Sequence, residues 1–331
     1  MINLLKFILS TQLKRSGINK TISGFTLIEL LVAMVMAVLI ITPLMAFMIN
    51  ILDGDRKEQA KATSEQEIQA ALDYIARDLD QAVYIYDADG VTRDTNTTTI
   101  TSSGIQDQIP PVKSAPNCSP TTSSSPSVCT PILVFWKREL IANSVGISDS
   151  AQTSFTETDD GFAYSLVAYY LITNPNQTTN STWSQEARIG RLQLRGPVNA
   201  TNANTTGSTS DSGFNEPPLN KSGASLKEKM NQWQTALGAL GSYTQRVETL
   251  IDYVSTTAPS STPCSSPNLV GSQTSGFFAC VDANEVLAQV YIRGNALARL
   301  QNNNLAYTPN TKTYFPSSSI RVQGHGFLFT K

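Results

Sequence analysis

The sequence has little of what catalytic or metal-binding chemistry usually requires. Its 331 residues contain one histidine, His325, and four cysteines, none of them in a Cys-x-x-Cys pair. A single histidine without a recognisable partner motif does not support a Ser–His or Cys–His pair, and a structural zinc site usually needs several Cys or His ligands. Glycine-rich phosphate loops of the G-x-G-x-x-G or Walker type are also missing. We therefore predict no catalytic residues, no cofactor, no metal ion and no enzymatic activity.

Charge of either sign is sparse, and the sequence shows no strong basic excess. Only 15% of the residues are charged, and the formal net charge is −2. Four of the 24 basic residues lie in the first 24 positions; without them, 20 basic residues remain against 26 acidic ones, which gives −6. Nucleic-acid-binding domains carry basic patches, so we predict no nucleic-acid partner. The abundance of Ser, Thr and Asn favours an exported domain with a polar surface.

One long stretch lacks charge almost entirely. Between Lys20 and Asp53 the only charged side chain is Glu29. An apolar run of more than about 20 residues is long enough to cross a bilayer as a helix. A carboxylate in such a run costs about 2.5–3.5 kcal/mol at the membrane centre, so Glu29 is a candidate functional residue. The alternative is a signal anchor that tolerates an acid near its edge.

The order of parts differs from that of a secretory signal peptide, because the small residue Gly24 precedes the apolar run. The segment Gly24-Phe-Thr-Leu-Ile-Glu-Leu30, behind a basic leader, resembles the processing site of type IV pilins and type II secretion pseudopilins. The resemblance implies that a prepilin peptidase cuts between Gly24 and Phe25 and methylates the new Phe25 amine. It also implies an assembly role for Glu29, which would pair with the Phe25 amine of a neighbouring subunit.

The helix is predicted to continue beyond the apolar run, from Phe25 to about Val83. Apolar residues recur there at steps of three and four, at Ile68, Leu72, Ile75, Leu79 and Val83, as in an amphipathic helix. Charged residues, among them Glu67, Arg77 and Asp78, are expected on the other faces. The predicted organisation is a cleaved leader at 1–24, a membrane or filament-core helix at 25–52, an amphipathic helix at 53–86 and an exported head at 87–331.

The predicted fold class is α+β, with a long N-terminal helix packed on an antiparallel-sheet head of the pseudopilin type that has long loops. Runs rich in β-branched and aromatic residues predict strands at 131–137, 164–172, 188–195, 286–293 and 319–323. An apolar pattern at 226–254 is interpreted as a helical insertion, interrupted near Gly238 and Gly241.

The four cysteines form two local pairs beyond the membrane segment, Cys118 with Cys129 and Cys264 with Cys280. An even number at close spacing in an exported domain favours two disulfides. A metal site is the weaker alternative, because the single histidine is remote in sequence.

Two further groups of polar residues have more than one interpretation. Asp87-Ala-Asp89-Gly90 resembles the start of a calcium loop but lacks the later acids of an EF-hand. Four arginines on or beside predicted strands are candidates for contact with an acidic ligand or, alternatively, for ordinary solvated strand faces: Arg191, Arg195, Arg293 and Arg299.

The head is larger than that of a typical major pilin, and the segment 69–82 is similar to large minor pseudopilins of the PilW and J types. Segments 64–75, 83–89, 134–139, 165–170 and 292–301 resemble the pseudopilins of hormogonium polysaccharide secretion in filamentous cyanobacteria. The resemblance implies a non-enzymatic minor subunit of a type IV pilus-like or type II secretion-like filament, serving polysaccharide secretion and gliding motility.

The implied partners are prepilin peptidase, other pilins and pseudopilins, an inner-membrane assembly platform and a secreted polysaccharide. The implied location is the inner membrane, crossed once, with the head in the periplasm and later on a filament or the cell surface. The alternative function is a membrane-anchored surface lectin or adhesin that never enters a filament.

Overall fold

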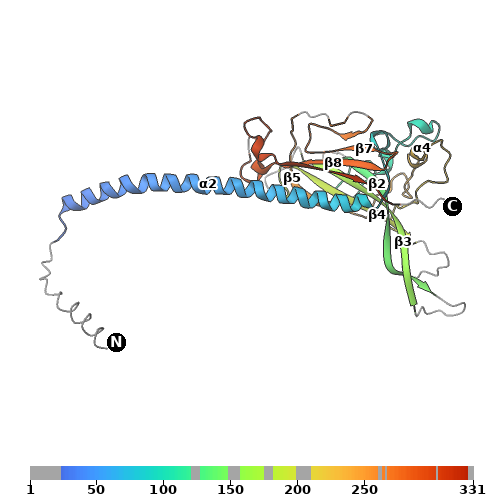
Figure 1. Cartoon of the computed structure of the whole chain (residues 1–331), viewed down its shortest axis with the longest axis horizontal. Coiled ribbons are helices and arrows are strands. Elements are labelled where there is room, and N and C mark those ends of the chain that lie inside the picture. Colours follow the sequence, from blue (N-terminus) through green and yellow to red (C-terminus); the bar gives the residue numbers. More distant parts are fainter. Residues whose placement is uncertain are drawn as a thin grey trace. The chain divides into compact units, whose positions relative to one another are not determined.

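The computed structural model describes residues 24–120, 127–147, 157–174, 182–198, 210–259, 263–264, 267–302 and 305–326 (Figure 1). The chain forms two units, Met1–Asp55 and Arg56–Lys331. Helix α2 (Leu27–Asp80) contributes to both, and the strands belong to the second unit. The predicted leader lies outside the described residues except for Gly24.

The second part of α2 has the predicted apolar stripe on its buried side. Ile68, Leu72, Ile75 and Leu79 are at most 1% exposed. Burying a Leu or Ile side chain contributes about 1.5–3 kcal/mol, so this stripe is a main stabilising contact of the head. These four side chains belong to one continuous core with buried aromatic residues of the strands that follow, among them Phe135 and Tyr169.

The predicted end of the helix near Val83 is wrong. Helix α2 ends at Asp80, and Ala82–Ile85 form strand β1. The four consecutive side chains of β1 are all buried. A helix at the surface buries only one face, so four consecutive residues of such a helix would not all be buried. The carbonyl of Asp80, at the end of α2, accepts a hydrogen bond from the backbone N–H of His325 at 2.9 Å. His325 thus supplies the donor that the next turn of the helix would have supplied.

Two antiparallel sheets make up the rest of the head, which confirms the α+β class. The first has the order β1-β2-β3-β4-β5, with β2 at Val128–Ile147, β3 at Glu157–Thr173, β4 at Ala187–Val198 and β5 at Glu248–Val254. The second has the order β6-β7-β8-β9, with β6 at Leu269–Gly271, β7 at Phe277–Asp282, β8 at Leu287–Arg293 and β9 at Ser317–Gln323. The five predicted strands are confirmed as β2, β3, β4, β8 and β9.

The remaining regular elements are short. They are α3 (Ala88–Thr92), α4 (Leu226–Met230) and the 3-10 helices η1 (Ile100–Ser102), η2 (Gln106–Gln108), η3 (Ala296–Arg299) and η4 (Lys312–Tyr314). The helical insertion predicted at 226–254 is therefore wrong beyond Met230. Its aromatic residue Trp233 is 1% exposed and lies edge-on to Trp136 of β2, with ring centroids 5.8 Å apart. The apolar residues of this segment cover the sheet from turns and from β5.

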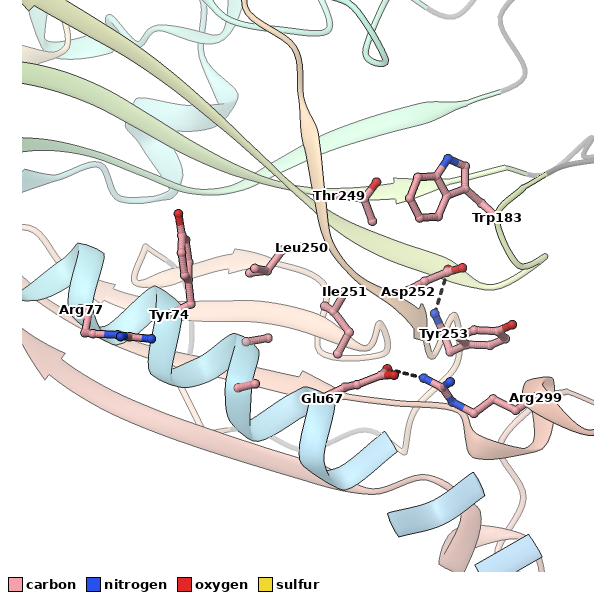
Figure 2. Close-up of a pocket in the computed structure, with 12 residues that line it drawn as sticks. Glu67, Tyr74, Arg77, Trp183, Thr249, Leu250, Ile251, Asp252, Tyr253 and Arg299 are labelled. Carbon is pink, nitrogen blue, oxygen red and sulfur yellow. Dashed lines mark hydrogen bonds and ion pairs between the residues drawn. The ribbon is translucent and has the colours of Figure 1, made fainter. Parts of the chain in front are cut away.

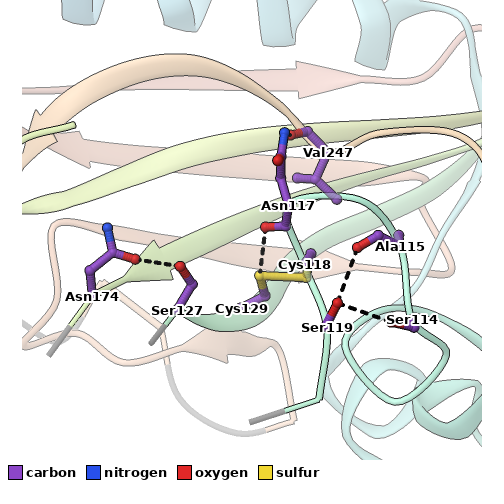
Figure 3. Close-up of a disulfide and its surroundings, with 9 residues drawn as sticks. All are labelled: Ser114, Ala115, Asn117, Cys118, Ser119, Ser127, Cys129, Asn174 and Val247. Atoms are coloured by element: carbon purple, nitrogen blue, oxygen red, sulfur yellow. Dashed lines mark hydrogen bonds between the residues drawn. A yellow bond between two sulfur atoms is a disulfide. The ribbon is translucent and has the colours of Figure 1, made fainter. Parts of the chain in front are cut away.

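Both predicted cysteine pairs lie at disulfide distance. The Cα atoms are 5.8 Å apart in Cys118–Cys129 and 6.0 Å apart in Cys264–Cys280. Figure 3 shows the first pair beside Asn117, whose side-chain amide donates to the Val247 carbonyl at 3.3 Å. This disulfide links the turn at 115–118 to the start of β2. The same turn is joined, through the hydrogen bond of Asn117, to Val247, the residue that precedes β5.

We expect the Cys118–Cys129 disulfide to stabilise the head. The double variant Cys118→Ser/Cys129→Ser should lower the free energy of unfolding by about 2–4 kcal/mol, because the bond closes a short loop in the unfolded chain. The measurement is denaturant unfolding of the full chain in detergent, with the neighbouring Ser119→Ala as control. Peptide mapping without reductant should recover both pairs, and free thiols or a Cys118–Cys264 link would contradict the pairing.

Candidate processing and assembly site

The candidate site begins where the chain enters α2. Gly24, Phe25 and Thr26 precede the helix, which starts at Leu27. The Thr26 hydroxyl oxygen accepts a hydrogen bond from the Glu29 backbone N–H at 3.3 Å, and the Thr26 carbonyl accepts one from Leu30 N–H at 3.1 Å. Thr26 therefore caps the helix, because it satisfies a backbone donor that has no partner inside the first turn.

Glu29 lies in the first turn of α2, three residues after Thr26. The Thr-x-x-Glu spacing is that of a capping box, and the Thr26 hydroxyl lies 3.5 Å from Glu29 Oε2, a long contact. A carboxylate is favoured near a helix N-terminus by the helix dipole. The Thr-x-x-Glu pattern in the sequence was the signal from which this local role could have been predicted.

The fold gives no reason for a glycine at position 24. Among the described residues, a Cβ atom at Gly24 would meet no other atom within 4 Å, and its φ lies outside the left-handed region. Glycine is usually required by a positive φ or by a close backbone approach. Among the described residues, neither applies at Gly24.

The first part of α2 presents its apolar side chains to the surroundings. Every residue from Gly24 to Arg56 is exposed, including Phe25 at 82% and Leu27 at 85%. By length and composition, α2 is able to cross a membrane. An apolar surface of this extent is stable only when lipid or other helices cover it.

A buried group of charged side chains joins the last turn of α2 to the first sheet. Asp78 accepts hydrogen bonds from Arg191 Nε and from the Tyr169 hydroxyl, both at 2.7 Å. Lys137 Nζ lies 3.1 Å from Asp78 and 3.1 Å from Glu139. Asp78 is only 8% exposed, so its expected place on a solvated helix face is wrong. These contacts connect α2 to β2, β3 and β4.

The electrostatics of this group keep Asp78 charged. Burial by itself raises the pKa of a carboxyl group, because the carboxylate loses its hydration. The hydrogen bond and the charge of Arg191, the charge of Lys137 and the hydrogen bond from Tyr169 together outweigh burial and hold the pKa of Asp78 below its usual value. The interaction with Asp78 likewise holds the pKa of Arg191 above its usual value, although burial alone lowers it.

We expect Asp78→Asn to destabilise the head strongly. The change leaves Arg191 and Lys137 buried with less opposing charge, which costs about 3–5 kcal/mol. Near-UV circular dichroism of the full chain during heating measures this loss of stability, with the exposed Asp73→Asn as control.

The same group makes the stability of the head depend on pH, because the pKa of Asp78 is lower in the folded state than in the unfolded state. The stability that ionised Asp78 contributes is therefore present above about pH 4, and it is lost as the pH falls below about 4 and through the folded-state pKa. The variant should therefore lose less stability than the wild type in that acid range; equal losses would contradict the assignment.

The two acids of the Asp87-Ala-Asp89-Gly90 segment have partners inside the head. Asp87 caps α3 by accepting from Gly90 N–H at 3.1 Å, and Lys227 Nζ contacts the carboxylates of both Asp87 and Asp89. The possible calcium loop thus holds a lysine ammonium. Within the residues that the structure describes, no group of three or more His, Cys, Asp or Glu side chains is placed to hold a metal ion.

The four arginines fall into different environments. Arg191 belongs to the Asp78 group, and Arg299 forms an ion pair with Glu67 of α2. The interpretation as solvated strand faces is therefore wrong for these two. Arg195 is exposed, and Arg293 is half-buried at the end of β8.

Comparison with protein families supports the N-terminal assignment. Residues 19–45 match the prokaryotic N-terminal methylation motif, the prepilin signal of type IV pilin-like proteins. The matched stretch contains Gly24, Phe25 and Glu29. No curated protein and no solved structure matches the chain. Proteins with this motif are generally non-enzymatic.

The motif and the exposed helix together support a type IV pilin-like or pseudopilin-like protein with a membrane-anchoring helix. The motif also implies processing by prepilin peptidase and assembly with other pilins. The match covers residues 19–45, at the start of the chain.

Proposed function

We propose that this chain is a minor, non-enzymatic pseudopilin that is cut between Gly24 and Phe25 and methylated at the Phe25 amine. The observation that carries the proposal is the order of residues from Gly24 to Glu29 at the start of a helix whose apolar side chains are exposed. The absence of any need for glycine in the described fold supports a role for Gly24 in recognition by the peptidase.

Assembly depends on Glu29 and on the amine that cleavage creates. In a filament of parallel helices, Glu29 of one subunit pairs with the Phe25 amine of its neighbour. Each charge is unfavourable in an apolar surrounding, and pairing neutralises both. The pair sets the axial position of each subunit, while the exposed apolar surface of α2 is covered by neighbouring helices.

The proposed filament is type IV pilus-like or type II secretion-like and serves polysaccharide secretion and gliding motility. The leader at 1–24 is removed, residues 25–52 span the inner membrane, and the head that follows faces the periplasm until assembly. An inner-membrane platform and other pseudopilins are the assembly partners. The size of the head and its sequence segments similar to minor pseudopilins support this role.

The mature N-terminus tests the proposal. Mass spectrometry of the protein from its native membranes should find a chain of 307 residues, 331 less the 24 of the leader, that begins with methylated Phe25. Immunoblots of sheared filaments should detect the same mature chain. A full-length chain that is missing from filaments would support the membrane-anchored lectin or adhesin instead.

A further inference from the structure

The head contains a groove of about 420 Å³ between α2 and β5 (Figure 2). Its aromatic lining comes from three parts of the chain: Tyr74 of α2, Trp183 before β4 and Tyr253 of β5. Tyr74 is 39% exposed and Trp183 is 43% exposed. Large aromatic side chains gathered at one concave place on a surface usually mark a binding site.

An arginine lies over the ring of each of these three side chains. The guanidinium carbon of Arg299 is 4.2 Å from the Tyr253 ring centroid, and those of Arg191 and Arg188 are 5.5 Å from Tyr74 and Trp183. Cation–π attraction restricts how the rings turn. The groove is therefore organised before a ligand arrives, which reduces the entropy lost on binding.

The backbone at the end of β5 is also held in an unusual conformation. Tyr253 has a φ of 60°, which a bulky side chain rarely adopts. Its N–H donates to Asp252 Oδ1 at 2.8 Å, and its carbonyl accepts from Asn295 N–H at 2.8 Å. Strained backbone of this kind concentrates at binding sites, and here it places the Tyr253 ring against Arg299.

The charges that line the groove are largely balanced within the protein. Arg299 is paired with Glu67, and the negative charge of Asp252 acts on Arg188. Asp252 accepts hydrogen bonds from Ser184 at 2.7 and 2.9 Å. Each carboxylate oxygen has more than one acceptor position, so Asp252 retains capacity for a further donor. A strongly charged ligand would find little net opposite charge.

We infer that this groove binds a neutral saccharide, with pyranose rings against Tyr74 and Trp183 and hydroxyl groups against Asp252 and Arg77. The C–H groups on one face of a pyranose carry slight positive charge and match the negative face of an aromatic ring. Its hydroxyls both donate and accept, which suits a carboxylate beside a guanidinium. An alkyl chain would desolvate these polar groups without replacing their hydrogen bonds.

This inference goes beyond the proposed filament role and depends on the head alone. The test uses the full chain in phosphatidylcholine nanodiscs, because glycosidic detergents would compete for the groove. The probes are neutral gluco-, galacto- and manno-oligosaccharides, with hyaluronate as an anionic comparison. Of the three tryptophans, Trp136 and Trp233 are at most 1% exposed, so acrylamide quenching of tryptophan fluorescence reports on Trp183.

We expect at least one neutral oligosaccharide to protect Trp183 from acrylamide in a saturable manner. Tyr74→Ala should weaken that binding about tenfold, the effect expected of losing one stacking contact. Trp183→Ala removes the exposed tryptophan that acrylamide quenches, so for this variant calorimetry should show a similar weakening. Phe162→Ala is the matched control, because Phe162 is also 39% exposed but lies outside the groove; it should bind normally.

Several outcomes would overturn the inference. They are no saturable binding across the panel, binding of hyaluronate alone, or affinity unchanged in both groove variants. Protection that grows with protein concentration and ignores the sugar would assign the groove to a second copy of the chain. Failure of Gly24 processing with normal sugar binding would reject the filament role and leave the saccharide site in place.

Discussion

Gly24→Val should leave nearly all of the protein as the full-length precursor. A branched side chain beside the scissile bond obstructs a peptidase that needs close approach to the backbone. The variant should still insert and fold, because a Cβ atom at Gly24 would meet no described atom within 4 Å. Immunoblotting of membranes should show the leader retained, and filaments should lack the protein. The effect is therefore on processing, with the stability of the head unchanged.

The matched control is Gly54→Val. Gly54 is an exposed glycine of α2, and a Cβ atom there would likewise meet no described atom within 4 Å apart from those of adjacent residues and the helix's own backbone. It lies far along the helix from the scissile bond, so this variant should be processed normally. Normal maturation of the Gly24→Val chain would reject the assignment of the cleavage site. A lower melting temperature of the head in Gly24→Val than in the wild type would show that the fold itself needs glycine at position 24.

Glu29→Leu should be inserted and processed but excluded from filaments. Removing the carboxylate removes a charge that is costly in an apolar surrounding, so the single subunit becomes easier to place in a membrane. The filament then has a Phe25 amine without its partner, and a broken buried pair costs about 3–5 kcal/mol. Quantitative immunoblots of sheared filaments measure incorporation, and polysaccharide export should fall if this subunit starts assembly.

The structure supplies an alternative role for Glu29 as part of the Thr26 cap, and a second variant separates the two. Thr26→Val removes the cap hydroxyl but keeps the carboxylate, and the loss of such a cap costs about 1 kcal/mol. It should therefore be incorporated nearly as well as the wild type. Glu58→Leu, which removes an exposed acid beyond the apolar segment, controls for a general loss of charge. Recovery of Glu29→Leu protein in filaments at the wild-type level would show that the acid has no assembly role.

Much of the fold was visible in the sequence wherever the pattern was long. The amphipathic stripe and five of the strands were found because each repeats a period over several residues. Strand β1 was missed because only Gln81 separates it from the helix and because Val83 continues the helix's spacing of apolar residues. Strand β5 was taken for part of a helix, because its short apolar pattern suits either structure until pairing with β4 decides it.

The methylation motif at 19–45 was visible in the sequence because its parts lie close together. Gly24, Phe25 and Glu29 lie within six positions, and their roles in cleavage, methylation and assembly stay predictions. The Thr26 cap was equally local and was available from the same residues. The two cysteine pairs were also close in sequence, so few alternative pairings had to be weighed.

The sequence by itself determined the class of this protein, since the motif at 19–45 and the apolar helix depend only on neighbouring residues. Only the tertiary structure decided how the head uses its charges and rings. Asp78 and Arg191 are 113 positions apart and meet because β4 passes beside the end of α2. The groove likewise gathers Tyr74, Trp183 and Tyr253 from three separate parts of the chain. No local pattern encodes such contacts, because they exist only once the chain has buried a common core.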